Sequence, residues 1–149
     1  MNLLLLSMAL ASNRVDRPTS VSGVLGWPGG LGVDVAHNFS DRFGIQGQAM
    51  TWVAFTDLGF RLRGYPVGGQ RWALVTSGGL HGLLAPVLFS PGALAAEVGV
   101  GTEYRGDRGF LFGVDLGPAL WLTDPKHTEG GDGPLSLTFF GQLRLGWAW

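Results

Sequence analysis

The sequence predicts an all-β fold, an eight-stranded antiparallel up-and-down transmembrane β-barrel. Apolar residues alternate with small or polar ones along most of the chain, the period of two that is typical of strands with two unlike faces. Only 14% of the residues are charged and 26 of the 149 are glycine, against about 25% charged and ~7% glycine in ordinary soluble domains. The mean hydropathy is +0.23, yet no apolar run reaches the roughly 20 residues that a spanning helix needs.

Composition also limits the classes of function. The net charge is −1 and no run of basic residues is present, so nucleic acid is not an expected partner. The chain has no cysteine, which excludes disulfide frameworks, cysteine zinc sites and thiol catalysis.

The longest apolar run lies at the N-terminus. It extends over residues 3–11, is broken by Ser7, and is followed by polar and charged residues. Residues 9–11 read Ala-Leu-Ala, the small-residue pattern of a signal-peptide cleavage site. We therefore expect residues 1–11 to be a signal peptide and residues 12–149 to form a single barrel domain. Because no Lys or Arg precedes the run, a short buried or terminal segment is the alternative.

Four strands are expected in the first half of the barrel domain. The first covers about residues 19–27, and the next three are centred on the alternating apolar sets Leu31, Val33 and Val35, then Phe43 and Ile45, then Leu58, Phe60 and Leu62. Turn residues separate the first strand from the second, at Pro28-Gly29-Gly30, and the second from the third, at Ser40-Asp41-Arg42. The boundary between the third and fourth strands, around residues 52–55, has no strong turn residue.

Four longer strands are expected in the second half. They are centred on Trp72, Leu74 and Leu80, then Leu94, Val98 and Val100, then Phe110, Phe112 and Leu116, and finally on the apolar face that runs from Leu135 to Trp149. The expected turns here are Pro66-Val67-Gly68-Gly69, Pro91-Gly92 and Gly106-Asp107-Arg108-Gly109. The last connection, Asp124 to Pro134, is the longest.

The polar face of each strand is expected to point into the barrel. A soluble lipocalin-like barrel would show the same alternation, but its outer surface would need abundant lysine, and the chain has only Lys126. Small residues beside long charged ones suit the narrow interior of an eight-stranded barrel. Eleven residues at ~3.3 Å each, tilted by ~40°, would rise about 28 Å, which matches an apolar membrane band of ~25 Å.

The inward charges nearly balance, as a buried network requires. Five acidic and four basic residues are expected inside: Asp34, Asp57, Glu97, Glu103 and Asp115, with Arg61, Arg63, Arg105 and Arg144. Arginine suits such pairing because its planar fork binds a carboxylate through two hydrogen bonds.

The final strand carries a resemblance to a known family. Its apolar residues alternate up to an aromatic terminus, through Phe139, Leu143, Leu145, Trp147 and Trp149. From about Thr19 to its end, the chain resembles the small eight-stranded outer-membrane barrels of Gram-negative bacteria, the OmpA/OmpX type, in which such a strand is the signal read by the assembly machinery. Trp149 stands where that family more usually has Phe.

The resemblance implies location in the bacterial outer membrane, contact with lipid and lipopolysaccharide, and a monomeric state. If both termini are periplasmic, the turns after the second, fourth and sixth strands face the periplasm and should be short. Two of these expected turns, residues 40–42 and 106–109, are short.

No convincing catalytic, cofactor or metal site is expected. Ser77 and His81 share a face but lie about 13 Å apart along one strand, too far for a nucleophile and its base. His127 lies near Asp124, Glu129 and Asp132, a set that could bind a cation but is more simply a solvated loop. His37 has no catalytic partner nearby. Gly99-Val100-Gly101 lies within a strand, so it does not form a nucleotide-binding turn.

The sequence therefore predicts a non-enzymatic outer-membrane barrel with a structural or surface-interaction role. Some barrels of the resembled size are lipid A deacylases, with His and Ser two residues apart, a pair that this chain lacks. A lipid-modifying enzyme of that kind and a small pore remain the alternatives. Inward Arg61 and Arg63 would select anions if water filled the interior.

Overall fold

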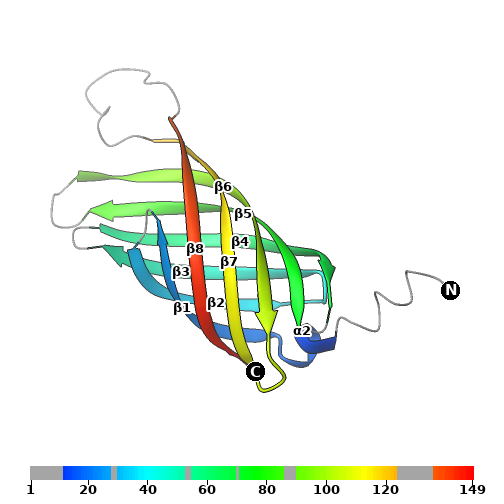
Figure 1. Cartoon of the computed structure of the whole chain (residues 1–149). Coiled ribbons are helices and arrows are strands. Elements are labelled where there is room, and N and C mark those ends of the chain that lie inside the picture. Colours follow the sequence, from blue (N-terminus) through cyan, green and yellow to red (C-terminus); the bar gives the residue numbers. More distant parts are fainter. Residues whose placement is uncertain (1–11, 28–29, 53–54, 70, 86–89, 124–135) are drawn as a thin grey trace.

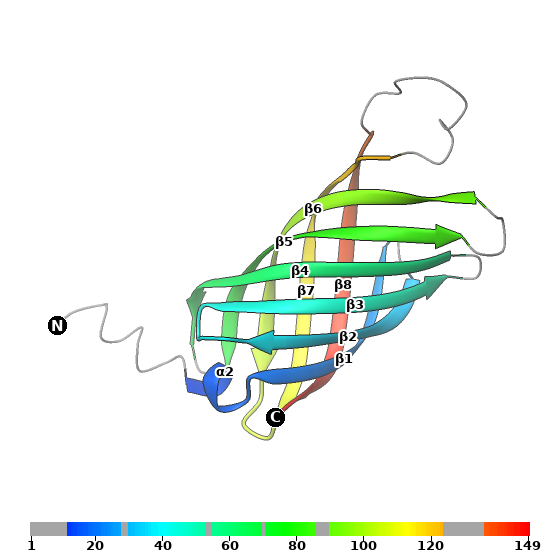
Figure 2. The same ribbon diagram turned by 180° about the vertical axis from the view of Figure 1, so that it is seen from behind.

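The described part of the chain forms a closed β-barrel. The computed structural model describes residues 12–27, 30–52, 55–69, 71–85, 90–123 and 136–149. Eight strands within these residues pair antiparallel in sequence order, and the last closes on the first (Figures 1 and 2). The strands are β1 (Thr19–Trp27), β2 (Gly30–Asn38), β3 (Phe43–Trp52), β4 (Phe55–Gly68), β5 (Trp72–Ala85), β6 (Ser90–Arg105), β7 (Phe110–Trp121) and β8 (Ser136–Ala148). The predicted all-β, eight-stranded antiparallel barrel is confirmed.

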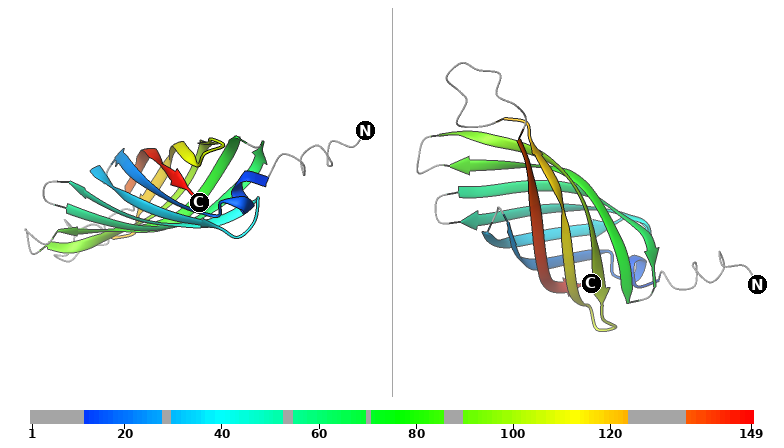
Figure 3. Two further views of the ribbon diagram at one scale, coloured as in Figure 1. Left: turned by 90° about the horizontal axis from the view of Figure 1, so that it is seen from below. Right: turned by 45° about the horizontal axis from the view of Figure 1, so that its top comes forward.

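The barrel has two different ends. At one, which we call the turn end, lie the connections 39–42 and 106–109, residues 69 and 71, the end of β8 and a short helix, α2 (Ser12–Asp16) (Figure 3). At the other, which we call the loop end, β1, β3, β5 and β7 terminate. The described residues include no helix that is long and apolar enough to cross a membrane.

Alternation along the strands produces two distinct faces. In β7, Leu111 and Asp115 are buried, whereas Leu116 is 57% exposed. Neighbouring strands repeat the pattern in register: Leu116 lies opposite Val100 of β6 and Gly141 of β8. Because successive side chains of a strand point to opposite faces, this register gathers the charged residues inside the barrel and leaves most of the large apolar side chains outside.

Two of the expected turns are well formed at the turn end. The Ser40 hydroxyl accepts hydrogen bonds from the backbone N–H groups of Arg42 and Phe43, at 3.3 and 3.2 Å. In the other turn, the N–H of Gly109 donates to the carbonyl of Gly106 at 2.9 Å. Gly109 has a φ of 100°, a left-handed conformation that favours glycine.

Two other expected turns are wrong, because all of their residues except Gly69 lie within strands. β4 continues through Pro66, with Val67 opposite Leu74 and a register shift after Gly64. Such an irregularity tolerates a proline, which cannot donate to the ladder. Similarly, Pro91-Gly92 belongs to β6, whose first residue pairs with Ala85 next to another register shift. Proline and glycine mark strand irregularities as well as turns, so the pattern alone could not separate the two.

Two predictions fall on residues that the structure does not describe. The expected signal peptide, residues 1–11, lies outside the described residues. The same holds for Asp124, His127, Glu129 and Asp132, the possible cation-binding group of the last connection. The boundary between the third and fourth strands had no clear turn signal in the sequence. The structure ends β3 at Trp52 and begins β4 at Phe55, and these two residues pair with each other.

Candidate functional site

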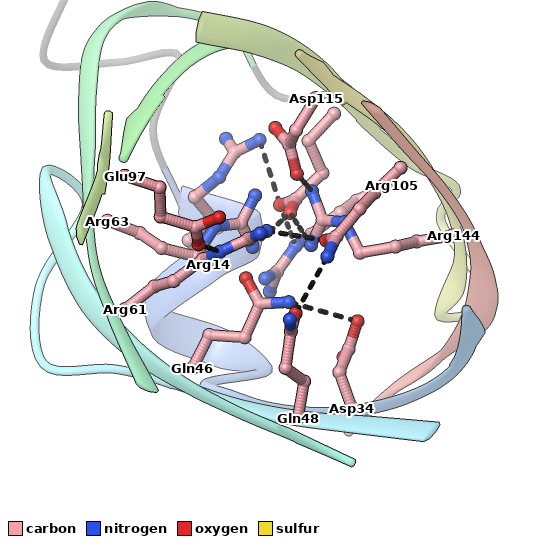
Figure 4. Close-up of polar contacts among 12 residues, drawn as sticks. Arg14, Asp34, Gln46, Gln48, Arg61, Arg63, Glu97, Arg105, Asp115 and Arg144 are labelled. Carbon is pink, nitrogen blue, oxygen red and sulfur yellow. Dashed lines mark hydrogen bonds and ion pairs between the residues drawn. The ribbon is translucent and has the colours of Figure 1, made fainter. Parts of the chain in front are cut away.

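The charged residues of the described strands all lie inside the barrel. Each is at most 4% exposed, and together they are the nine residues assigned to the interior from the sequence: Asp34, Asp57, Arg61, Arg63, Glu97, Glu103, Arg105, Asp115 and Arg144. They come from β2, β4, β6, β7 and β8. Figure 4 labels seven of these residues and shows their side chains converging in the lumen.

Glu103 is the centre of this network. Its carboxylate contacts Arg105 Nε at 2.7 Å and Arg63 Nη1 at 2.8 Å. Arg14 Nη2 and Arg144 Nη1 lie at 3.5 and 3.6 Å. One fully buried carboxylate is thus shared by four guanidinium groups, which come from α2, β4, β6 and β8.

A neighbouring carboxylate completes the pairing of Arg144. The Nη2 atom of Arg144 lies 2.8 Å from Asp115 Oδ2. Arg144 sits opposite Gly113 of β7, and a Cβ added at that glycine would lie 2.7 Å from the guanidinium. Glycine at this position therefore gives the arginine the room it needs, as expected for a narrow interior.

A second group of contacts surrounds Arg61. Its Nε pairs with Glu97 and its Nη1 donates to the amide oxygen of Gln142. Gln142 in turn donates to Gln48 Oε1 at 3.0 Å, and the guanidinium carbon lies 4.7 Å from the ring centre of Phe140. These contacts link β3, β4, β6 and β8 across the lumen.

His81 occupies the part of the interior nearer the loop end. Its Nδ1 is 3.2 Å from Asp57 Oδ2, and its Nε2 is 3.9 Å from Glu97 Oε2. The imidazole also packs against Trp121, with ring centres 5.6 Å apart. No hydrogen bond between Ser77 and His81 is present among the described residues, so the geometry provides no nucleophile–base pair there.

Arg14 belongs to the interior but was not among the residues predicted for it. Only 2% of this residue is exposed, and its guanidinium lies 4.6 Å from the ring centre of Tyr65 as well as beside Glu103. Burial lowers the pKa of Arg14 from its usual value, while Glu103 opposes that shift. Arg14 is the fifth cation against five carboxylates. The excess of one acid in the predicted set was the only sequence signal for it.

The segment that follows α2 is attached to the same end of the barrel. Arg105 Nη1 donates to the carbonyl oxygen of Arg17 at 2.9 Å. The backbone N–H of Asn38 donates to the carbonyl of Pro18 at 2.8 Å. Residues 14–18 therefore cover the turn end and contribute to the network from outside the sheet.

Removing the Arg14 side chain should loosen this cover without unfolding the barrel. In Arg14→Ala, Glu103 keeps two close arginines, so we expect a loss of about 1–2 kcal/mol, typical of one hydrogen bond to a charged group. Backbone hydrogen exchange should accelerate at Asn38, whose N–H binds Pro18. Unchanged exchange at Asn38 would mean that Arg14 does not hold the segment in place.

Side chains fill the interior around the arginines. Arg61, Arg63, Arg105 and Arg144 are each 1% exposed. A continuous aqueous channel would leave its lining accessible. Side chains that fill the lumen are what the diameter of an eight-stranded barrel allows.

The described residues provide little for other chemistry. Among them, no three His, Asp or Glu side chains are grouped so that they could hold a metal ion. His37 lies at the turn end, where its Nδ1 is 3.0 Å from the Thr19 hydroxyl. That contact is not a catalytic arrangement.

The outer surface is the reverse of the interior. Large apolar side chains are exposed on every strand, among them Val33, Leu58, Leu80, Val100 and Leu116. Aromatic residues gather near the turn end (Phe39, Phe43, Trp72, Phe110, Trp147 and Trp149), and Trp27 and Phe139 lie toward the loop end. The five residues of the C-terminal pattern, Phe139, Leu143, Leu145, Trp147 and Trp149, are all 37% or more exposed.

Every charged residue of the described strands lies inside the barrel, whereas large apolar side chains are exposed on every strand. No protein-family model, curated protein or solved structure matches the chain.

Proposed function

We propose that the protein is an integral β-barrel of the bacterial outer membrane, non-enzymatic and non-conducting, with a structural or surface-interaction role. The observation that carries this proposal is the inverted distribution of polarity. Glu103 and the arginines around it are buried, whereas leucine, valine and aromatic residues cover the outside. Soluble monomers rarely expose apolar patches larger than a few hundred Å², so this exterior requires an apolar surrounding.

Lipid is the surrounding that fits the whole circumference. The apolar surface covers all eight strands, and a protein partner would have to enclose the barrel completely. Closure of β8 on β1 also leaves no strand edge unpaired, and hydrocarbon demands that every backbone group be bonded within the protein.

The ends of the barrel support the same placement. Tryptophan and phenylalanine residues near the turn end and the loop end would lie at the two interfaces of the bilayer, where aromatic side chains are enriched. β1 and β2 have nine residues each and β3 has ten, close to the ~9–11 that a tilted spanning strand needs.

The outer membrane is proposed from the C-terminal strand. The alternation through Leu143, Leu145 and Trp147 to Trp149 resembles the signal that the outer-membrane assembly machinery reads. In this arrangement the turn end, which carries α2 and the end of β8, faces the periplasm. Lipid and lipopolysaccharide are then the constant partners of the outer face, and a monomer is the expected state.

Fractionation and electrophoresis test the proposal. The protein should remain in the outer membrane after carbonate washing, and it should migrate faster unboiled than boiled on detergent gels because the closed barrel resists the detergent. Purified protein in planar bilayers should give no channel currents. Release by carbonate without detergent would contradict membrane insertion, and steady ion currents would contradict the non-conducting interior.

A further inference from the structure

One groove interrupts the outer surface near the turn end. It has a volume of about 340 Å³, and most of its lining comes from β3, β4 and β5. These three strands form one wall of the barrel (Figure 2). Its lining includes Phe39, Phe43, Ile45, Leu62, Gly64 and Gly78. The register explains its shape, because Phe43 lies opposite Gly64 and Leu62 lies opposite Gly78. Large side chains therefore flank positions that have none.

The floor of the groove is open and apolar. A Cβ added at Gly78 would meet nothing closer than 3.8 Å, so the space above it is unfilled. The Thr76 hydroxyl is directed to the carbonyl oxygen of Gly64, at 3.4 Å. This hydroxyl is thereby engaged within the sheet. Arg63 and Ser77 also line the groove, but Arg63 is only 1% exposed, so the large exposed side chains that an occupant would meet are Phe39, Phe43 and Leu62.

An exposed arginine, Arg42, lies at the turn end next in sequence to the groove residue Phe43. Arg42 is exposed, and its carbonyl oxygen accepts the N–H of Tyr65, next to Gly64, at 2.9 Å. Among the described residues, its guanidinium has no ion-pair partner. Arg71, at the same end, is instead paired with Asp107, at 2.5 and 3.2 Å. Arg42 directly precedes Phe43 of the groove lining, so it supplies an exposed cation, unpaired within the described residues, next in sequence to the groove.

From these features we propose that the groove holds one phospholipid, with an acyl chain over Gly64 and Gly78 and the phosphate on Arg42. The proposal rests on membrane insertion, because it places the groove among lipids of the periplasm-facing leaflet. A phospholipid combines the two chemistries that the surface presents, a flexible apolar chain and an anionic group at one end. Arginine binds phosphate oxygens through its planar donors.

Two pairs of matched variants test this site. Gly78→Leu fills the groove, and Gly141→Leu is its control, since Gly141 is another outward glycine with no atom within 4 Å of an added Cβ. Arg42→Ala removes the proposed phosphate contact, and Arg108→Ala removes another exposed arginine of the turn end. Each protein is reconstituted in bilayers of phosphatidylethanolamine and phosphatidylglycerol, and its retained lipids are counted by native mass spectrometry.

The wild-type barrel and the two controls should retain one phospholipid. Retention should fall roughly tenfold in Gly78→Leu and in Arg42→Ala, corresponding to a loss of about 1.4 kcal/mol of binding free energy. Equal retention in Gly78→Leu and Gly141→Leu would overturn the site, and so would a dimer that only Gly78→Leu abolishes, because the groove would then hold a second copy. If the barrel is not a membrane protein, no variant retains lipid and the unboiled protein shows no shifted migration, which separates that failure from the loss of this site.

Discussion

Glu103→Gln is expected to destabilise the barrel by about 3–5 kcal/mol, the cost of removing one member of a buried ion-pair network. Glutamine keeps nearly the shape of glutamate but removes its negative charge. Arg63 and Arg105 would each lose their closest anion, at 2.8 and 2.7 Å, in a site where both arginines are only 1% exposed. The loss should appear as a lower urea midpoint for unfolding of the protein reconstituted in lipid vesicles.

An exposed ion pair of the turn end provides the control for this variant. Arg71 and Asp107 form a close pair whose side chains are 57% and 65% exposed, and Asp107 raises the pKa of the Arg71 guanidinium through their hydrogen bond. Asp107→Asn should leave the urea midpoint unchanged, because solvent screens such pairs. If Glu103→Gln were as mild as Asp107→Asn, the interior network would not be a source of stability.

Leu116→Arg is expected to cost about 2–4 kcal/mol, the effect of a cation on the lipid face at the bilayer midplane. Leu116 lies near the middle of β7 and points outward. In water, exchanging an exposed leucine for arginine would be nearly neutral. The cost therefore depends on hydrocarbon around this position, and unfolding in lipid vesicles measures it.

The matched control lies near the end of a strand. Leu137 of β8 also points outward and is 67% exposed, but it lies close to the loop end, where a cation can reach the interface. Leu137→Arg should cost only about 0–1 kcal/mol. Equal costs for the two variants would contradict the proposed depth of the barrel in the bilayer.

The two faces of the barrel could be read from the sequence because alternation is a local property. Once residues 110–121 form a strand, the inward direction of Asp115 and the outward direction of Leu116 follow from the geometry of the backbone. The same reasoning placed Arg144 inside from its neighbours in the last strand. The number of strands followed from counting such segments.

The partners inside the barrel could not be predicted in this way. Glu103 contacts four arginines because of the relative register of β4, β6 and β8. The alternation of single strands does not specify that register. Arg14 was missed for a related reason. It lies on a helix of five residues, too short to produce a helical pattern, and it meets Glu103 across 89 positions of sequence. Its role exists only once the barrel has closed.

The central claim is that the apolar face contacts lipid, and a spin label at position 116 tests it most directly. The chain has no cysteine, so Leu116→Cys can be labelled at that position alone and reconstituted in lipid vesicles. Oxygen dissolves in hydrocarbon, whereas a nickel chelate stays in water. The label should be relaxed by oxygen and protected from the nickel chelate. Relaxation by the nickel chelate as strong as that by oxygen would place Leu116 in water and contradict the membrane-spanning barrel.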